Sequence, residues 1–203
     1  MNPKDLKKAV QHLKNGGVVA IPTDTLYGLA ADVFNIDALA RVYEIKQRGA
    51  VALPVLVSSW GQVKRLAKDL PAQTEELVSR FWPGALTLGV DKASNVPDRL
   101  TAGMPTVAVR MPDHPVPIAL INGLGGPITG TSSNISGGPD LTTLTEVVEQ
   151  MGNRADYVLE CGPEPKGTAS TIVDLTSDVP KLLREGAVPF QLVLETWAAA
   201  GNH

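Results

Sequence analysis

Residues 17–28 read Gly17-Val18-Val19-Ala20-Ile21-Pro22-Thr23-Asp24-Thr25-Leu26-Tyr27-Gly28. The apolar run at 17–21 predicts a short buried strand, and the polar residues that follow predict a turn at its end. In one interpretation, Asp24 or Thr25 simply caps this turn by accepting hydrogen bonds from backbone amides. In the other, the turn binds a ligand, because Tyr27-Gly28 adds an amphipathic ring and a backbone that a ligand can approach closely.

Helical and strand patterns alternate along the rest of the chain. Asn2 and Pro3 start a helix that Gly16-Gly17 ends. Further helices are expected at 36–45, 60–67, 73–81, 115–124, 144–151 and 187–199. Further strands are expected at 53–57, 86–90, 106–110, 127–130, 157–160, 170–174 and 181–184. Because the order lacks strict βαβ regularity, the sequence predicts an α/β fold with one twisted mixed sheet and flanking helices.

The composition indicates one soluble domain. The chain has 203 residues, of which 43% are hydrophobic, enough for a substantial core, and no linker divides it. We expect a single domain over 1–203 without a C-terminal extension domain. The net charge of −3 and the 4% aromatic content argue against a protein that coats nucleic acid.

Cysteine and histidine usage narrows the chemistry. Cys161 is the only cysteine, so neither an intrachain disulfide nor a cysteine-based metal cluster is expected. The three histidines share no metal-like spacing. No early apolar run reaches the ~18 residues of a membrane span. These features predict a cytoplasmic protein that does not contact membranes.

Two cations lie at the end of the predicted helix at 36–45. Lys46 and Arg48 can stabilise that end through the helix dipole while they remain solvated. They can equally contact an anionic ligand, and the sequence leaves both interpretations open.

Arg110 ends the predicted strand at 106–110 and leaves it on the face opposite Val107 and Val109. A partly buried arginine needs an anionic partner. The sequence offers Asp113 for this role, or the carboxylate of a substrate.

Hydroxyls and glycines also gather at the ends of later strands. Residues 131–138 read Thr131-Ser132-Ser133-Asn134-Ile135-Ser136-Gly137-Gly138, and they follow the predicted strand at 127–130. The glycine-rich stretch at 125–134 lacks the Gly-Lys-Ser/Thr ending of a P-loop, and it has no dinucleotide fingerprint. A glycine-bearing loop at 162–171 and Arg184 repeat the theme. Together these features favour a site for a small anionic molecule such as a nucleotide.

In these segments, the chain resembles the threonylcarbamoyl-AMP synthase family, the YrdC/TsaC group. The resemblance covers about residues 5–190 and implies a YrdC-like fold with a large concave cavity. The matching motifs are Pro22-Thr23-Asp24-Thr25-Leu26-Tyr27-Gly28, Lys46-Gln47-Arg48, Phe81-Trp82-Pro83-Gly84, Thr106-Val107-Ala108-Val109-Arg110, Ser132-Ser133-Asn134 with Ser136-Gly137, Ser170-Thr171-Ile172-Val173-Asp174 and Leu183-Arg184-Glu185-Gly186.

The resemblance implies a reaction. L-threonine and bicarbonate or CO2 form an N-carboxylated amino acid, whose carboxylate attacks the α-phosphorus of ATP and expels pyrophosphate. The product is threonylcarbamoyl-AMP, which serves the threonylcarbamoyladenosine modification of tRNA. Mg2+ is expected to enter with ATP, without metal ligands from protein side chains. Expected partners are downstream tRNA threonylcarbamoyl-transfer proteins, and an RNA contact is possible.

The resemblance also implies roles for individual residues. Lys46 and Arg48 are expected to act in catalysis by positioning and by countering phosphate charge. The residues implied to bind threonine are Thr25, Arg110, Gly130 and Ser170. The residues implied to face ATP are Arg48, Thr106, Ser132, Asn134, Asp140 and Arg184.

The segment Gly49-Ala50-Val51-Ala52-Leu53-Pro54 departs from the family pattern, since it is one residue shorter and lacks a polar side chain. This difference keeps open an alternative, a non-catalytic YrdC-like protein that binds a nucleotide or RNA. A response to threonine distinguishes the two, because an RNA-binding module has no reason to show one. Carbamoyl transfer, as in hydrogenase maturation, is disfavoured because the cysteine-rich zinc motifs are absent.

Overall fold

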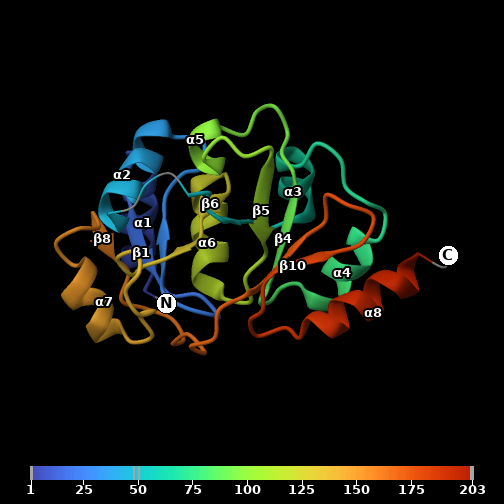
Figure 1. Ribbon diagram of the computed structural model, residues 1–203. Helices are drawn as coiled ribbons and strands as arrows, with labels where there is room; N and C mark the ends of the chain where they lie inside the picture. Colours follow the sequence, from blue (N-terminus) through green and yellow to red (C-terminus); the bar gives the residue numbers. More distant parts are fainter. Residues whose placement is uncertain (1, 48, 50, 202–203) are drawn as a thin grey trace.

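The computed structural model describes residues 2–47, 49 and 51–201. In this part of the chain, eight helices and ten strands form the predicted α/β fold (Figure 1). The helices are α1 (Pro3–Lys14), α2 (Ile36–Lys46), α3 (Trp60–Leu66), α4 (Thr74–Phe81), α5 (Asp98–Thr101), α6 (Pro115–Leu124), α7 (Leu144–Met151) and α8 (Phe190–Ala200). The strands are β1 (Val19–Ile21), β2 (Gly28–Ala30), β3 (Val55–Leu56), β4 (Leu86–Asp91), β5 (Thr106–Arg110), β6 (Ile128–Thr129), β7 (Thr131–Ser132), β8 (Tyr157–Val158), β9 (Thr171–Asp174) and β10 (Lys181–Arg184).

The strands form two mixed sheets where the sequence indicated one. The smaller sheet has the order β7-β2-β1-β8, with β1 antiparallel to β2 and parallel to β8. The larger sheet has the order β10-β9-β4-β5-β3-β6. In it, β4 is antiparallel to β5 and parallel to β9, and β3 is parallel to β5. The mixed character is thus confirmed, and the single sheet is corrected to two.

Thr129 connects the two sheets. Its backbone N–H donates to the Ala31 carbonyl at 2.9 Å, although β6 also pairs with β3 in the larger sheet. Its hydroxyl donates to the Leu29 carbonyl at 2.7 Å and accepts the Ala31 N–H at 3.0 Å. Because Thr129 is fully buried, these bonds are shielded from water. The chain therefore changes sheets at β6, which a strand pattern read from sequence does not reveal.

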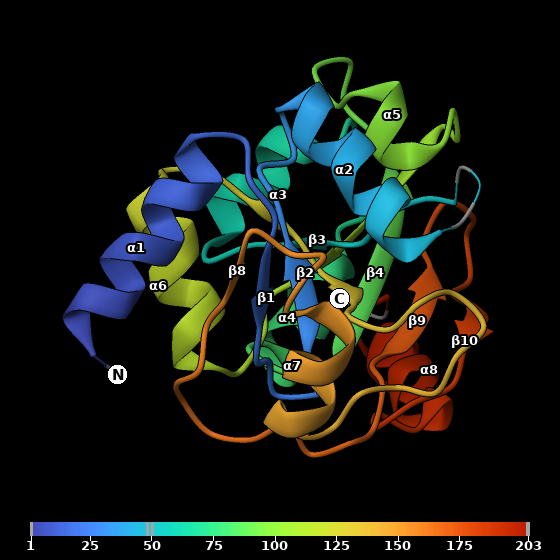
Figure 2. The same ribbon diagram turned by 90° about the vertical axis from the view of Figure 1, so that its left-hand side faces the viewer.

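Helices on both sides bury the apolar faces of the sheets. Helix α1 begins where the Asn2 side chain accepts the Lys4 N–H at 3.0 Å, which satisfies one of the free amides of its first turn. Its Ala9 and Leu13 pack with α6 against β1. Figure 2 shows α1 and α6 side by side on one flank of the molecule. Helices α4 and α8 pack together at the opposite end (Figure 1).

The three elements that the sequence did not predict are short. They are β2, β7 and α5, of two to four residues each. Strand β2 begins at Gly28, a residue type that is depleted in strands, and it forms because Gly28 pairs with Ile21 across the turn. None of the helices in the described ranges has the length and hydropathy that a membrane span requires.

Candidate functional site

A cavity of about 240 Å³ lies where both sheets present strand ends and loops. It is lined by the β1–β2 turn and by the ends of β5 and β10. The segment around the start of β9 and the segment that follows β6 also line it. All four residues that the resemblance implied for threonine line it: Thr25, Arg110, Gly130 and Ser170. Three of those implied for ATP also line it: Ser132, Asp140 and Arg184. The structure thus brings together residues that lie far apart in the sequence.

Thr23 organises the turn after β1. Its hydroxyl accepts the N–H groups of Thr25 and Leu26 at 3.2 and 3.3 Å and donates to the Leu26 carbonyl at 2.7 Å. The sequence had suggested Asp24 or Thr25 for this capping role. Because Thr23 fills it, the side chains of Asp24 and Thr25 are available for other contacts.

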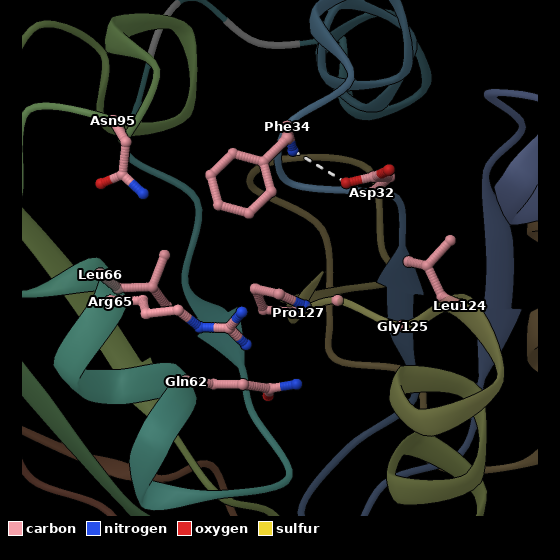
Figure 3. A pocket seen from close by; sticks show the side chains of 10 residues that line it. Asp32, Phe34, Gln62, Arg65, Leu66, Asn95, Leu124, Gly125 and Pro127 are labelled. Carbon is pink, nitrogen blue, oxygen red and sulfur yellow. Dashed lines mark hydrogen bonds between the residues drawn. The ribbon is translucent and has the colours of Figure 1, made fainter.

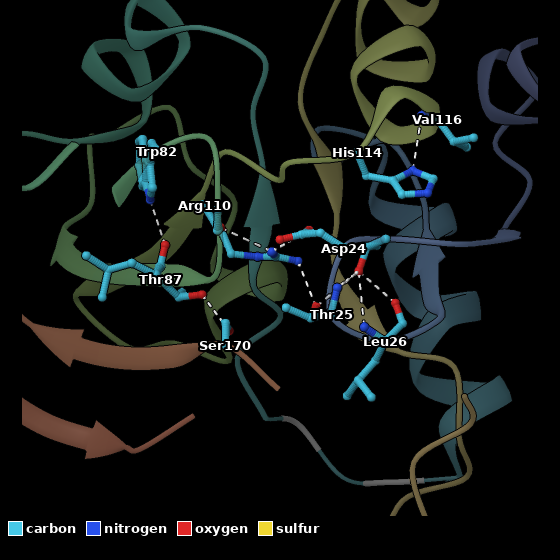
Figure 4. Close-up of polar contacts among 12 residues, drawn as sticks. Asp24, Thr25, Leu26, Trp82, Thr87, Arg110, His114, Val116 and Ser170 are labelled. Carbon is cyan, nitrogen blue, oxygen red and sulfur yellow. Dashed lines mark hydrogen bonds and ion pairs between the residues drawn. The ribbon is translucent and has the colours of Figure 1, made fainter. Parts of the chain in front are cut away.

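Asp24 instead pairs with Arg110. The Arg110 Nη1 lies 2.8 Å from Asp24 Oδ1, and Nη2 donates to Thr25 Oγ1 at 3.2 Å (Figure 4). Only 4% of Arg110 and 7% of Asp24 is exposed. Burial lowers the pKa of Arg110, and the neighbouring Asp24 partly opposes this shift. The anionic partner is therefore Asp24, not the suggested Asp113, because the β1–β2 turn packs against the end of β5.

Ser170 and Arg184 form the opposite wall. Arg184 donates to the Ser170 carbonyl from Nη2 at 2.8 Å and from Nε at 3.1 Å. The Ser170 hydroxyl lies 2.9 Å from the hydroxyl of Thr87, which the sequence analysis missed (Figure 4). Thr87 is a polar residue inside a buried strand, and this pattern in the sequence could have indicated a role at the site. Burial lowers the pKa of Arg184, the nearby Asp140 carboxylate opposes this shift, and the positive charge of Arg110 adds to it to a smaller degree. Two arginines and the carboxylate of Asp140 thus line one small cavity.

Lys46 lies beneath the loop at residues 132–134, and its expected catalytic role stays a prediction. It is 1% exposed, and its Nζ donates to the carbonyls of Ser132 and Asn134 at 2.6 and 2.9 Å. Lys46 is not among the residues that line the cavity. Helix α2 points its last turn inward beneath residues 132–134, so the ammonium group fixes the position of this loop.

Asn134 and Thr106 also lie away from the cavity lining. The Asn134 amide accepts the Ser132 hydroxyl at 2.6 Å and donates to the Gly138 carbonyl at 2.7 Å, so it orients the loop. Thr106 starts β5 and Arg110 ends it, which separates them by roughly 13 Å at strand spacing. The contacts of Asn134 and Thr106 with ATP stay predictions. Arg48 lies outside the described residues.

A loop at residues 162–167, here called the strap, runs beside the turn after β1. The Gly167 N–H donates to the Thr25 carbonyl at 2.9 Å, and the Lys166 N–H donates to the Asp24 carbonyl at 3.3 Å. These bonds hold the backbone of the turn, so the strap helps to fix where Asp24 and Thr25 point.

His114 holds the strap in place through a contact with its backbone. Its Nδ1 accepts the Val116 N–H at 3.2 Å (Figure 4), and its Nε2 lies 3.1 Å from the Pro163 carbonyl. A carbonyl can only accept, so the ring carries its hydrogen on Nε2 and is neutral. Burial lowers the pKa of His114, against smaller raising effects from Pro163, Asp24 and Asp113.

This lowered pKa predicts a pH dependence of stability. Below about pH 6.5 the unfolded chain takes up a proton at His114 that the folded chain resists, so the free energy of unfolding should fall. Urea denaturation at pH 7.5 and 5.0 measures it. His114→Asn keeps a neutral cap and should lose less stability between these pH values than the wild type. An equal loss in both proteins would contradict the role given to His114.

The fold and the cavity together define a class of protein. It is an α/β binding protein whose cavity, flanked by two arginines and several hydroxyls, suits a small anionic ligand. Among residues 2–47, 49 and 51–201, no group of three or more His, Cys, Asp and Glu side chains could hold a metal ion. The chain belongs to the Sua5/YciO/YrdC family, whose model, described as "Telomere recombination", matches residues 11–186. The family resemblance predicted from sequence is confirmed.

Named relatives refine this assignment. A threonylcarbamoyl-AMP synthase from Pyrococcus abyssi is 39% identical over 92% of this chain, which spans 55% of that protein. A putative threonylcarbamoyl-AMP synthase from Mycobacterium tuberculosis is 38% identical over 95% of this chain and 88% of that protein. The solved structure of P. abyssi Sua5 complexed with L-threonine superposes with a TM-score of 0.91 at 38% identity, over 94% of this chain and 56% of that one.

Proposed function

We propose that this protein makes L-threonylcarbamoyl-AMP from L-threonine, bicarbonate or CO2 and ATP, with release of pyrophosphate, for the threonylcarbamoyladenosine modification of tRNA. The relatives named as synthases and the threonine complex of P. abyssi Sua5 support this proposal. The single observation that carries it in this chain is Arg110, a buried arginine oriented by Asp24 at the wall of the cavity.

We assign the threonine subsite to the space between Arg110, Gly130 and Ser170. The Arg110 guanidinium, steered by Asp24 and Thr25, is suited to bind the amino acid carboxylate. A Cβ at Gly130 would lie 2.6 Å from Leu56 Cγ, so only glycine lets the backbone pass there. The Gly130 N–H already bonds the Pro54 carbonyl at 2.7 Å. We therefore assign the Gly130 carbonyl and the Ser170 hydroxyl to the polar groups of threonine.

The nucleotide is assigned to the other side, beside Ser132, Asp140 and Arg184. The carboxylate of N-carboxythreonine attacks the α-phosphorus, a new P–O bond forms, and the bond to pyrophosphate breaks. Arg184 counters the charge that develops on phosphate, while Arg110 holds the nucleophile in line. Mg2+ enters as part of the Mg·ATP substrate, and we assign it no protein ligand.

The proposed product is a mixed anhydride of a carbamate and a phosphate, which water can hydrolyse. We therefore propose that tRNA threonylcarbamoyl-transfer proteins receive this product directly from the protein. We also propose that the protein works in the cytoplasm.

The test is threonine-dependent release of pyrophosphate. Purified protein is incubated with ATP, Mg2+ and bicarbonate, with and without L-threonine, and the nucleotide product is identified by mass spectrometry. We expect release only with threonine, together with the mass of threonylcarbamoyl-AMP. ATP or threonine binding without release would refute the synthase and support the non-catalytic binding protein.

A further inference from the structure

A second cavity, of about 340 Å³, lies at the other end of β6. It is lined from the β2–α2 loop, α3, the β4–α5 loop and the α6–β6 loop, and it shares no lining residue with the first cavity. Pro127 lines the second cavity and Gly130 lines the first, roughly 10 Å apart at strand spacing. Ile128 and Thr129 between them are fully buried. The two cavities are therefore separate.

Phe34 supplies an aromatic surface at this cavity. The residue is 44% exposed, although large apolar side chains usually avoid water. The Asp32 carboxylate accepts the Phe34 N–H at 2.9 Å and so fixes the backbone that carries the ring (Figure 3). A flat, partly exposed ring held in this way is suited to stack on another ring.

Polar groups surround the ring. Gln62 is 7% exposed, and its Oε1 accepts the Ser58 N–H at 2.9 Å, which leaves its NH2 group for a ligand. The side chains of Asn95 and Arg65 have no hydrogen bond or ion pair to another described residue, and Figure 3 shows both directed towards the same space as Phe34. Amides recognise base edges, and a guanidinium binds phosphate or stacks on a base. A ring, two amides and one arginine together match the groups of a nucleotide.

The lining of the cavity carries one cation and one anion, Arg65 and Asp32. Lys64 and Lys68 lie near Arg65 in the sequence, but neither lines the cavity, and the Lys64 ammonium lies over the Trp60 ring, 5.8 Å from its centroid. Arg65 is therefore the lining group that is suited to bind a phosphate.

We propose that this second cavity binds one nucleotide, stacked on Phe34, with its base edge at Gln62 and Asn95 and its phosphate at Arg65. The nucleotide can be a free nucleoside monophosphate or one unit of a single-stranded RNA, since both present the same groups. The site is independent of the proposed synthesis, because none of its residues lines the first cavity.

The experiment measures nucleotide binding, and variants at the second cavity locate it. With saturating L-threonine present, calorimetry follows the binding of AMP, GMP, CMP and UMP, and fluorescence anisotropy follows a labelled single-stranded oligoribonucleotide. We expect at least one of these ligands to bind. Tighter binding of the monophosphates identifies the free nucleotide as the ligand, and tighter binding of the oligonucleotide identifies RNA.

Two variants test the location. Phe34→Ala removes the stacking ring and should weaken binding on the order of 10- to 100-fold. Gly126→Leu should weaken it by filling the cavity, because a Cβ at Gly126 meets nothing within 4 Å and the backbone there is not left-handed. The matched control is Val148→Ala, which removes an apolar side chain of similar exposure (42%) from α7. All three should keep wild-type melting temperatures and threonine-dependent pyrophosphate release.

The proposal is overturned if no probe binds under these conditions, or if both Phe34→Ala and Gly126→Leu bind like the wild type. Failure of pyrophosphate release in the wild type bears on the proposed synthesis alone. The two proposals can therefore fail separately.

Discussion

Arg110→Ala should lower kcat/KM for threonine by about 100- to 1,000-fold, because it removes the charged group assigned to the threonine carboxylate. The variant should also be less stable by about 3 to 5 kcal/mol, since the buried Asp24 loses its partner at 2.8 Å. Steady-state pyrophosphate release and urea denaturation measure the two effects on the same protein. Activity equal to that of the wild type would refute the threonine subsite.

Loss of stability alone could inactivate Arg110→Ala, so a second variant separates the causes. The double variant Asp24→Asn with Arg110→Met removes both buried charges, and it should recover most of the stability while remaining inactive. The matched control is Arg41→Ala, which breaks the exposed pair between Arg41 and Asp156 at 2.9 Å. An exposed pair contributes about 0 to 1 kcal/mol, so this control should remain stable and active.

Lys46→Met should destabilise the protein by about 3 kcal/mol, since the carbonyls of Ser132 and Asn134 lose a buried charged donor. Methionine keeps most of the apolar volume, so the loss reports on the hydrogen bonds more than on packing. Urea denaturation measures it, with Lys7→Met on the exposed face of α1 as the control, which should change stability by no more than about 0.5 kcal/mol.

The same variant distinguishes the two roles considered for Lys46. If the ammonium group fixes the loop at 132–134, stability and activity should fall together. A variant that is as stable as the wild type but inactive would support the catalytic role that the family resemblance implied.

The sequence predicted the strand ends well and the side-chain directions poorly. Thr25, Arg110, Gly130 and Ser170 line one cavity because each lies in or beside a turn at the end of a buried strand, and such ends are visible as polar residues after apolar runs. The direction of Lys46 was not visible, because a cation in the last turn of a helix satisfies the helix dipole whether it points outward or inward.

Contacts between distant segments set the other limit. Asp24 and Arg110 are 86 residues apart, and no pattern along the chain connects them, so the nearby Asp113 looked equally suitable. The division into two sheets has the same origin, because it depends on Thr129 meeting Leu29 and Ala31. The cavity at Phe34 gave no sequence signal, since its groups come from four separate loops and helices.

The wide separation of these contacts along the sequence affects how the protein folds during its synthesis on the ribosome. The Asp24–Arg110 pair closes a loop of 86 residues, the Lys46–Asn134 contact closes one of 88, and the wall at Ser170 needs Arg184 from β10. Contacts between such distant residues form slowly, because the entropy cost of closing the loop comes before any gain from the contact. A nascent chain that lacks β10 therefore has its first helices and strands but only part of the cavity. Translation must pass residue 184 before any ribosome-bound chain can be active.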